Sequence, residues 1–342
     1  MSLTHAALAA HVPLAIATRG PAVESIHYGS VAVVDRSGHL LYAAGDPEAL
    51  TFTRSALKPV QALPFVAAGG VERFGFAPEQ VALLCASHSG EPRHVDAVGD
   101  MLTRSGSSAA DLQCGTHAPG FYEARGEIPP PPPYSPLAHN CSGKHAGMLA
   151  YCAMCGHPKG DYLQFDHALQ QAIREAVATF TGVPEPDLVA GIDGCSAPNY
   201  AVPLARLARA YARLAAPDVD PAYGRAPQIL ANAMTTYPEM VSGERRSDLA
   251  LMRAGRGEWI TKIGAEGVQA IGIKGEGLGI AIKLADGQKR GLYPAIVAVL
   301  DALRLIDNRA ASELDSWGHP QLRNYRGIRT GDVRGILVLD KR

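Results

Sequence analysis

The chain has 342 residues, of which 47% are hydrophobic and 19% are charged. It can therefore bury a large core, which argues against a disordered protein. A formal net charge of −1 gives no long-range field for phosphate backbones or anionic membranes, so we expect neither a nucleic-acid nor a membrane partner. His11 and Pro13 interrupt the N-terminal apolar stretch, so we expect no signal peptide, a cytoplasmic location and six reduced cysteines.

The first third of the chain predicts a hairpin followed by helical segments. Residues 25–44 contain two β-rich runs separated by a turn at residues 35–38, which is typical of an antiparallel hairpin. Residues 54–68 have helical apolar spacing. The short apolar run at 81–87 fits either a buried strand or a helix, and a polar turn follows it.

The middle and the end of the chain alternate between helical and strand-like patterns. The five prolines at 129–133 predict a stiff extended connector between two packed regions. Residues 162–180 and 199–214 predict helices, and residues 188–195 predict a strand that enters a tight turn. Strands joined by Gly-rich turns are expected over 260–287, with a helix after them over 292–306.

These segments together predict the α+β class, with a mixed sheet assembled from N-terminal and C-terminal strands and covered by a largely helical middle. We expect residues 1–342 to form a single catalytic unit. Its sheet-bearing region would span approximately 20–110 plus 255–342. A mostly helical region would span approximately 135–250.

Ser55 and Lys58 form the first candidate for chemistry. A three-residue step on a helix places both side chains on one face, within mutual reach. A lysine amine can take the proton of a serine hydroxyl when burial or nearby positive charge lowers its pKa. The alternative is that Ser55 caps the helix and Lys58 is a solvated residue of the first turn.

Two further segments carry polar residues where buried runs end or bend. Ser87 opens a small polar cluster at 87–90, which fits either a cleft or an ordinary turn. Lys274 belongs to a glycine-lined strand at 271–277. Glycines there permit close approach of a substrate, although they also fit a bulge or a hairpin with a surface lysine.

Two cysteine-bearing loops suggest a metal. Cys141 lies in the segment 139–145, and Cys195 lies in the segment 191–196, each beside serine and glycine. Two thiolates with one further nitrogen donor could hold Zn²⁺, and a lysine amine could be that donor only when neutral. Neither loop has a standard zinc signature, so the spacing alone leaves this open.

The motifs, in this order, resemble the rhizobial-type L-asparaginases, a family distinct from the asparaginases with a threonine nucleophile. The resemblance covers nearly the whole chain, and its longest strings are unusual. The matching segments are RSALKP at 54–59, CASHSGE at 85–91, HNCSGKHAGML at 139–149, GIDGCSAPNYAVPL at 191–204 and IGIKGEG at 271–277.

This resemblance implies a fold like that of serine β-lactamases and glutaminases, a homodimer, and hydrolysis of L-asparagine to aspartate and ammonia. It implies Ser55 as the nucleophile with Lys58 as its base, and Ser87 with Lys274 as a second Ser-Lys pair. The residues alone would also allow the two pairs to exchange roles.

The resemblance also implies a zinc site and three residues of the substrate pocket. The zinc ligands would be Cys141, Lys144 and Cys195, and the pocket positions would be Arg54, His145 and Asp193. Asp193 would bind the α-amino group of the substrate. We expect the zinc to position the substrate rather than to activate water, although a structural clamp between the two loops is the alternative.

Two other functions remain open. Ser-Lys chemistry also serves related serine amidases and β-lactamase-like hydrolases, but the opposite charges of Arg54 and Asp193 favour a free amino acid as the substrate. The non-enzyme alternative is a zinc-stabilised binding module. That alternative gives no reason for two Ser-Lys pairs.

Overall fold

The computed structural model describes residues 8–342. Residues 1–7, which belong to the N-terminal stretch considered for a signal peptide, lie outside this range. Within the described residues, no helix combines the length and the apolar character needed to cross a membrane.

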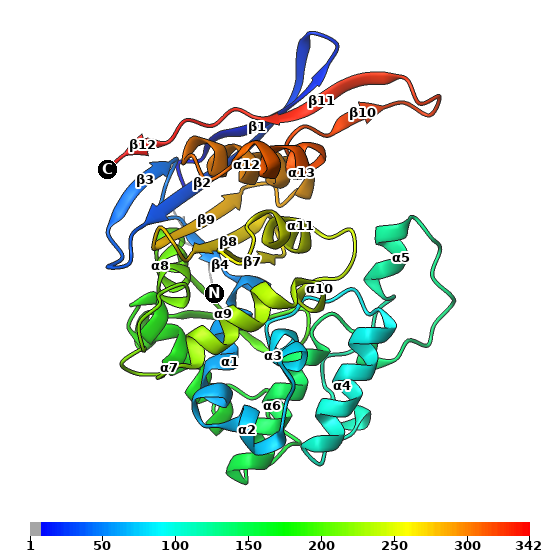
Figure 1. Cartoon of the computed structure of the whole chain (residues 1–342), viewed down its shortest axis with the longest axis vertical. Helices are drawn as coiled ribbons and strands as arrows, with labels where there is room; N and C mark the ends of the chain where they lie inside the picture. The colour runs from blue at the N-terminus through cyan, green and yellow to red at the C-terminus, as the bar shows by residue number, and fades with distance from the viewer. Residues whose placement is uncertain (1–7) are drawn as a thin grey trace.

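The main feature is a curled antiparallel sheet built from both ends of the chain (Figure 1). Its strands follow the order β10-β11-β1-β2-β9-β8-β7, and β3 pairs with both β2 and β12. The bounds are β1 Val12–Arg19, β2 Ala22–Val34, β3 Leu40–Ala44, β7 Trp259–Gly264, β8 Val268–Ile273, β9 Leu278–Leu284, β10 Gln321–Arg323, β11 Arg329–Gly335 and β12 Asp340–Lys341.

The α+β class and the contribution of both termini are confirmed, but the expectation of a mixed sheet is wrong. Every strand pairing in the described part of the chain is antiparallel. The expected hairpin is β2–β3, and β7–β8–β9 is a second set of consecutive strands. Short turns between consecutive strands produce antiparallel pairs, because a parallel pair needs a long crossover connection.

Helices cover both faces of this sheet. On β2, Val31 and Val33 point into the core shared with α12 (Lys289–Ala302) and α13 (Asn308–Gly318). The alternate residues Ala32 and Val34 point into the larger core shared with α8 (Leu204–Leu214) and the helical region. This period of two is the expected pattern for a strand that is buried on both faces.

Two glycines let α8 lie directly on the sheet. A Cβ atom at Gly279 would lie 1.9 Å from the carbonyl oxygen of Ala208, and one at Gly272 would lie 2.6 Å from that of Tyr211. Any side chain at these positions would push the helix away. The backbone of α8 therefore contacts β8 and β9 directly. The buried side chain of Tyr211 on this helix contacts the segments next to these strands.

The helical region begins earlier in the chain than the sequence predicts. Helices occupy most of residues 54–104, and of the two alternatives for residues 81–87 the structure has the helix, the end of α3. The elements of the region are η1 Arg54–Leu57, α1 Lys58–Ala67, α2 Gly70–Phe74, α3 Pro78–Leu84, α4 Pro92–Arg104, α5 Gly120–Arg125, α6 Ser142–Cys155, α7 Ala168–Thr181, α9 Ala226–Thr236, α10 Pro238–Val241 and α11 Ser247–Ala254.

A small second sheet lies within the helical region. It has the order β4-β6-β5, with β4 Leu50–Phe52, β5 Val189–Ile192 and β6 Pro198–Pro203. The strand expected at 188–195 is therefore confirmed as β5. The helix expected over 199–214 is only its second part, α8, because residues up to Pro203 pair with β4 and β5.

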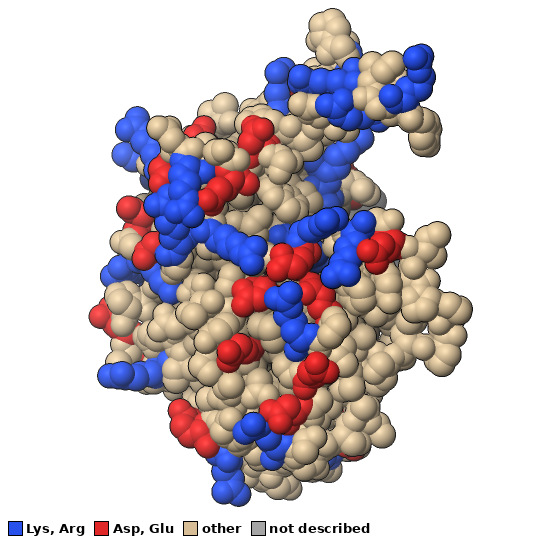
Figure 2. Space-filling model, turned by 45° about the vertical axis from the view of Figure 1, so that its right-hand side comes forward, with Lys and Arg blue, Asp and Glu red and all other residues tan. Residues whose placement is uncertain are grey.

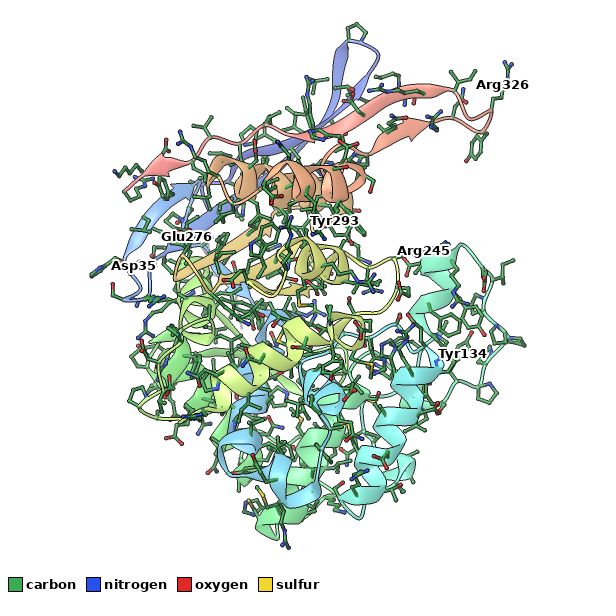
Figure 3. All side chains as sticks on the ribbon, viewed as in Figure 1. Asp35, Tyr134, Arg245, Glu276, Tyr293 and Arg326 are labelled. Carbon is green, nitrogen blue, oxygen red and sulfur yellow. The ribbon has the colours of Figure 1, made fainter. Side chains whose placement is uncertain are left out.

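The proline run forms an exposed outlying loop beside α5 (Figure 3). The hydroxyl of Tyr134 donates a hydrogen bond to the carbonyl oxygen of Pro130 at 2.9 Å, so the loop folds back on itself. Figure 3 also shows Arg326 at the tip of the projecting β10–β11 hairpin. In Figure 2, Lys and Arg side chains gather on that hairpin, whereas both signs of charge mix over the body of the same face.

Candidate active site

Ser55 lies on η1, a short turn held in a strained conformation. The preceding residue, Arg54, has φ of 48°, which is the left-handed region that side chains other than glycine rarely adopt. Asn199 on β6 fixes this turn, because it accepts from the Arg54 backbone N–H at 3.0 Å and donates to the Arg54 carbonyl at 3.1 Å. The buried Tyr211 hydroxyl donates to the Ala56 carbonyl at 2.8 Å. Ser55 is thereby held half-buried between two fixed neighbours.

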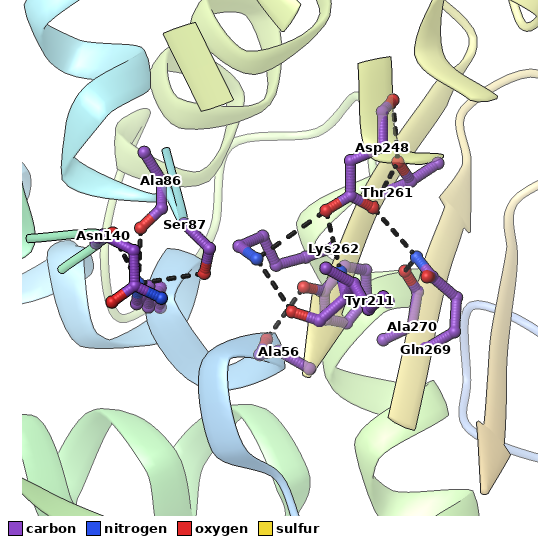
Figure 4. Close-up of polar contacts among 12 residues, drawn as sticks. Ala56, Ala86, Ser87, Asn140, Tyr211, Asp248, Thr261, Lys262, Gln269 and Ala270 are labelled. Carbon is purple, nitrogen blue, oxygen red and sulfur yellow. Dashed lines mark hydrogen bonds and ion pairs between the residues drawn. The ribbon is translucent and has the colours of Figure 1, made fainter. Parts of the chain in front are cut away.

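Lys58 is fully buried at the start of α1. Its amine donates to the carbonyl oxygen of Ala86 at 2.5 Å, the hydroxyl of Ser87 at 3.0 Å and the carbonyl oxygen of Asn140 at 3.3 Å (Figure 4). Three acceptors match the three hydrogens of an ammonium group. The structure thus pairs Lys58 with Ser87 rather than with Ser55.

Lys274 does not join Ser87, contrary to the pairing expected from the sequence. It is half-buried just after β8, where its amine donates to Asn232 at 3.2 Å and to Thr235 at 3.1 Å. Both partners belong to α9. The turn between β8 and β9 directs this lysine onto a helix surface, so glycine-rich surroundings were a misleading signal.

Lys262 on β7 is the candidate residue that the sequence analysis missed. It is fully buried, and burial lowers its pKa to about 8 although the carboxylate of Asp248 acts to raise it. Strand alternation places Lys262 on the same face as Ile260, which belongs to the core shared with the helical region. The available signal was a lysine inside an otherwise apolar strand that is buried on both faces.

β7 brings Lys262 to the segment that carries Ser55. This strand is at one end of the sheet and packs against η1. The packing is close, since a Cβ atom at Gly264 would lie 2.8 Å from the carbonyl oxygen of Thr53 and 3.4 Å from the Cβ atom of Arg54. The turn that carries Ser55 therefore contacts both α1, which begins at Lys58, and β7, which carries Lys262.

The two cysteine-bearing loops meet, as the sequence analysis expected. The amine of Lys144 lies 3.1 Å from the sulfur of Cys195. A hydrogen bond from the Cys141 thiol, aided by the charge of Lys144, lowers the pKa of Cys195 well below its usual range. Cys141, Lys144 and Cys195 thus form a buried group of two sulfurs and one amine.

His145 lies behind this group. It is fully buried on α6, and its Nδ1 atom shares a hydrogen bond with the Tyr162 hydroxyl at 2.7 Å. Its buried Nε2 atom has no hydrogen bond of standard geometry among residues 8–342, but the ring interacts with the Cys195 sulfur and helps to lower the pKa of that thiol. This placement suits a residue that supports the sulfur group better than one that is open to solvent on the substrate side.

The donor set fits zinc in chemistry, although it is not a standard His/Cys cluster. Within the described range, no three His, Cys, Asp or Glu side chains gather around a common metal position. The expected third ligand is a lysine. Two thiolates and a neutral amine are donors that Zn²⁺ accepts, and His145 lies close enough to the Cys195 sulfur to help lower its pKa.

Arg54 and Asp193 form an ion pair beside a cavity. The Nε atom of Arg54 lies 2.7 Å from Oδ1 of Asp193, and the Gly194 N–H donates to the same oxygen at 2.9 Å. Both residues line a cavity of about 430 Å³ together with Asn199. The expected opposite charges therefore border a space of the size of a small ligand site, whose lining includes Arg54 but not the neighbouring Ser55.

Comparisons with known proteins identify a family. The sequence profile of the L-asparaginase II family matches residues 15–335. No curated protein matches the chain at a significant level.

Two solved structures are similar to the chain. A β-lactamase from Mycobacterium bovis is 16% identical with a TM-score of 0.40, and the similarity covers 80% of this chain and 94% of the other. A protein from Bacteroides dorei named as a β-lactamase is 14% identical with a TM-score of 0.42, over 80% of this chain and 93% of the other.

Proposed function

Because the chain belongs to the L-asparaginase II family, we propose that it hydrolyses the side-chain amide of L-asparagine to aspartate and ammonia. The observation that carries the proposal is that η1, which bears Ser55 and the Arg54–Asp193 ion pair, packs against α1 with its Lys58–Ser87 pair and against β7 with its buried Lys262. A binding module gives no reason for a buried Lys58–Ser87 pair and a second buried lysine on the strand that packs against η1.

The Arg54–Asp193 pair provides recognition of a free amino acid. The guanidinium of Arg54 would bind the substrate carboxylate. Asp193 would bind the α-amino group through Oδ2, since its hydrogen bonds from Arg54 and Gly194 both go to Oδ1. Charge-assisted hydrogen bonds of this kind fix orientation as well as affinity.

Ser55 is the proposed nucleophile because it is accessible. Ser55 is half-buried at the strained turn, whereas Ser87 is 4% exposed and already bound to Lys58. A nucleophile must reach the substrate carbon, and the more enclosed serine is better placed to relay protons. We therefore assign Ser87 and Lys58 to a relay behind Ser55.

Lys262 is the proposed base for Ser55. Its lowered pKa of about 8 makes the neutral amine accessible near neutral pH. The amine accepts the hydroxyl proton as the Ser55 oxygen attacks the amide carbon, and the departing nitrogen takes that proton and leaves as ammonia. Water then attacks the β-aspartyl ester, gives one proton to the amine, and releases aspartate while the proton returns to Ser55.

Zinc, a homodimer and a cytoplasmic location remain proposals drawn from the family resemblance. If zinc binds, Cys141, Lys144 and Cys195 would hold it, and it would position the substrate. The test is to measure zinc content in the wild type and in Cys195→Ser, together with kcat and KM after chelation. Chelation that leaves both kinetic constants unchanged would exclude a positioning role.

The test of the activity is ammonia release from L-asparagine and L-glutamine by the wild type, Ser55→Ala and Ser87→Ala. We expect release from asparagine to vanish in Ser55→Ala, together with the acyl-enzyme that intact mass measurement detects in the wild type. An acyl-enzyme that persists in Ser55→Ala and disappears in Ser87→Ala would move the nucleophile to Ser87. No ammonia from either substrate would contradict the proposed function and favour the related amidases or the binding module.

A further inference from the structure

Asp248 lies in the first turn of α11, outside the segments that match the family motifs, and is fully buried. Its Oδ1 atom accepts from the Thr261 hydroxyl at 3.0 Å and from the Gln269 amide at 3.1 Å. Its Oδ2 atom accepts from the Ile263 backbone N–H at 2.9 Å. The carboxylate thus binds both chain neighbours of Lys262 and one residue of the adjacent strand.

The same carboxylate faces the amine of Lys262 at 3.7 Å (Figure 4). That amine also donates to the carbonyl oxygen of Ile263 at 2.7 Å. The N–H and the C=O of Ile263 would otherwise stay unpaired, because β7 is the end strand of the sheet. Asp248 and Lys262 therefore close the free edge of β7 together, at the point where this strand meets η1.

Asp248 is the only carboxylate among the charged groups that act on Lys262 from the described elements around it. The positive groups are Lys58 on α1 and Arg246 before α11, and Cys141 contributes a thiol. Cys85 after α3 and Tyr211 on α8 are the other titratable groups nearby, and burial raises the pKa of both, so they are neutral near pH 8. Of these groups, Asp248 and Cys141 act to raise the pKa of Lys262, and Asp248 has the larger effect.

We propose that Asp248 is a positioning residue that fixes the amine of Lys262 at the edge of β7 and sets the pH at which this amine loses its proton. This inference rests on the proposed function for its catalytic meaning, but the coupling between the two side chains does not depend on it. The carboxylate stabilises the ammonium form. Removing its charge must make proton loss easier.

The direct test measures the proton on Lys262 without using activity. The chain contains eight lysines, so ¹³C at the lysine ε carbons gives a spectrum simple enough to assign with Lys262→Met. We expect a midpoint near pH 8 in the wild type and a decrease of about one to three pH units in Asp248→Asn. Thr261→Val is the matched control, because it removes one hydrogen bond to the carboxylate and keeps the charge.

Two outcomes would overturn the coupling. One is an unchanged Lys262 midpoint in folded Asp248→Asn, and the other is an equal decrease in Thr261→Val. If Asp248→Asn does not fold, the wild type provides the test. The carboxyl carbon of Asp248, labelled with ¹³C and assigned by its absence from Asp248→Glu, should shift at the Lys262 midpoint, and a flat titration would overturn the proposal.

Kinetics then separate this inference from the proposed function. If Lys262 is the base, kcat/KM for L-asparagine falls at acid pH as this amine takes up a proton. The midpoint pH of that acid limb should be lower in Asp248→Asn by the same amount as the Lys262 midpoint. A midpoint that moves while the acid limb stays in place would refute Lys262 as the base and would leave the coupling intact.

Discussion

Two buried lysines lie on elements that pack against η1, the turn that carries Ser55, and their surroundings differ in kind. Lys58, in the helical region, meets two carbonyl oxygens and the Ser87 hydroxyl. Lys262, on the sheet edge, meets a carboxylate and one carbonyl oxygen. Three neutral acceptors hold the Lys58 amine in one place, whereas burial lowers the pKa of Lys262 to about 8 although the Asp248 carboxylate acts to raise it. The two lysines are similarly buried, but we propose different roles for them: Lys58 relays protons and Lys262 is the base.

The largest effect should come from removing each amine in turn. Lys58→Met and Lys262→Met should each lower kcat for L-asparagine by about 10²- to 10⁴-fold, because each loses a proton-transfer group. Only Lys262→Met should also lose the decrease in kcat that the wild type shows as the pH falls below about 8. The measurement is kcat against pH, with circular dichroism as a control for folding. An acid limb near pH 8 that survives in Lys262→Met would erase the distinction between the two amines.

A smaller effect should come from the Arg54–Asp193 ion pair beside the cavity. This pair is proposed to bind the substrate on which both amines act. Asp193→Asn should raise KM for L-asparagine about 10- to 100-fold, since one charge-assisted contact to the α-amino group is lost. The same variant should leave KM for succinamate almost unchanged, because that amide has no α-amino group. Equal increases for both amides would show that Asp193 supports the turn rather than the substrate.

The helical region also contains a histidine, His88, that should make the stability of the folded state depend on pH. Burial, with the nearby His94 and Lys58, lowers the pKa of His88 well below its usual value. The unfolded chain then binds more protons than the folded one below about pH 6.5, so the folded state loses stability as pH falls. This contribution should be complete above that pH.

Replacing His88 should therefore flatten the acid side of the stability profile. In His88→Gln, the free energy of unfolding should fall less steeply between about pH 6.5 and 5, by up to ~1.4 kcal/mol per pH unit. Urea unfolding at several pH values measures this slope. Lower stability at every pH with an unchanged slope would mean that His88 does not titrate on unfolding.

The smallest effect should come from Lys274, the lysine that the sequence analysis expected to pair with Ser87. Lys274→Met should change kcat/KM for L-asparagine by less than about threefold, because its amine is bound to Asn232 and Thr235 on α9. Ammonia release measures this, with Lys262→Met assayed in parallel. If kcat/KM falls as much in Lys274→Met as in Lys262→Met, the pairing of Ser87 with Lys274 expected from the sequence would be restored. The contrast between Lys58 and Lys262 would then no longer explain the site.

Much of this protein could be predicted from local patterns. The hairpin of β2 and β3, the strands at 260–284 and the helix of α12 follow from apolar periodicity and turn residues, which are local properties of the chain. The meeting of the Cys141 and Cys195 loops and the closeness of Arg54 to Asp193 agree with the family motifs, which carry information about distant contacts. The helices within residues 70–104 could not be placed from local patterns, since their arrangement depends on which segments pack together.

The amino-acid sequence by itself determined the α+β class, the chemical groups available and the segments that bear them. Only the tertiary structure decided which lysine meets which serine. A lysine amine is carried on a long flexible side chain, so its partner depends on where distant strands and helices cross. Lys262 reaches the site because β7 is the end strand and packs on η1, whereas Lys274, twelve residues later, is directed onto α9 by a turn.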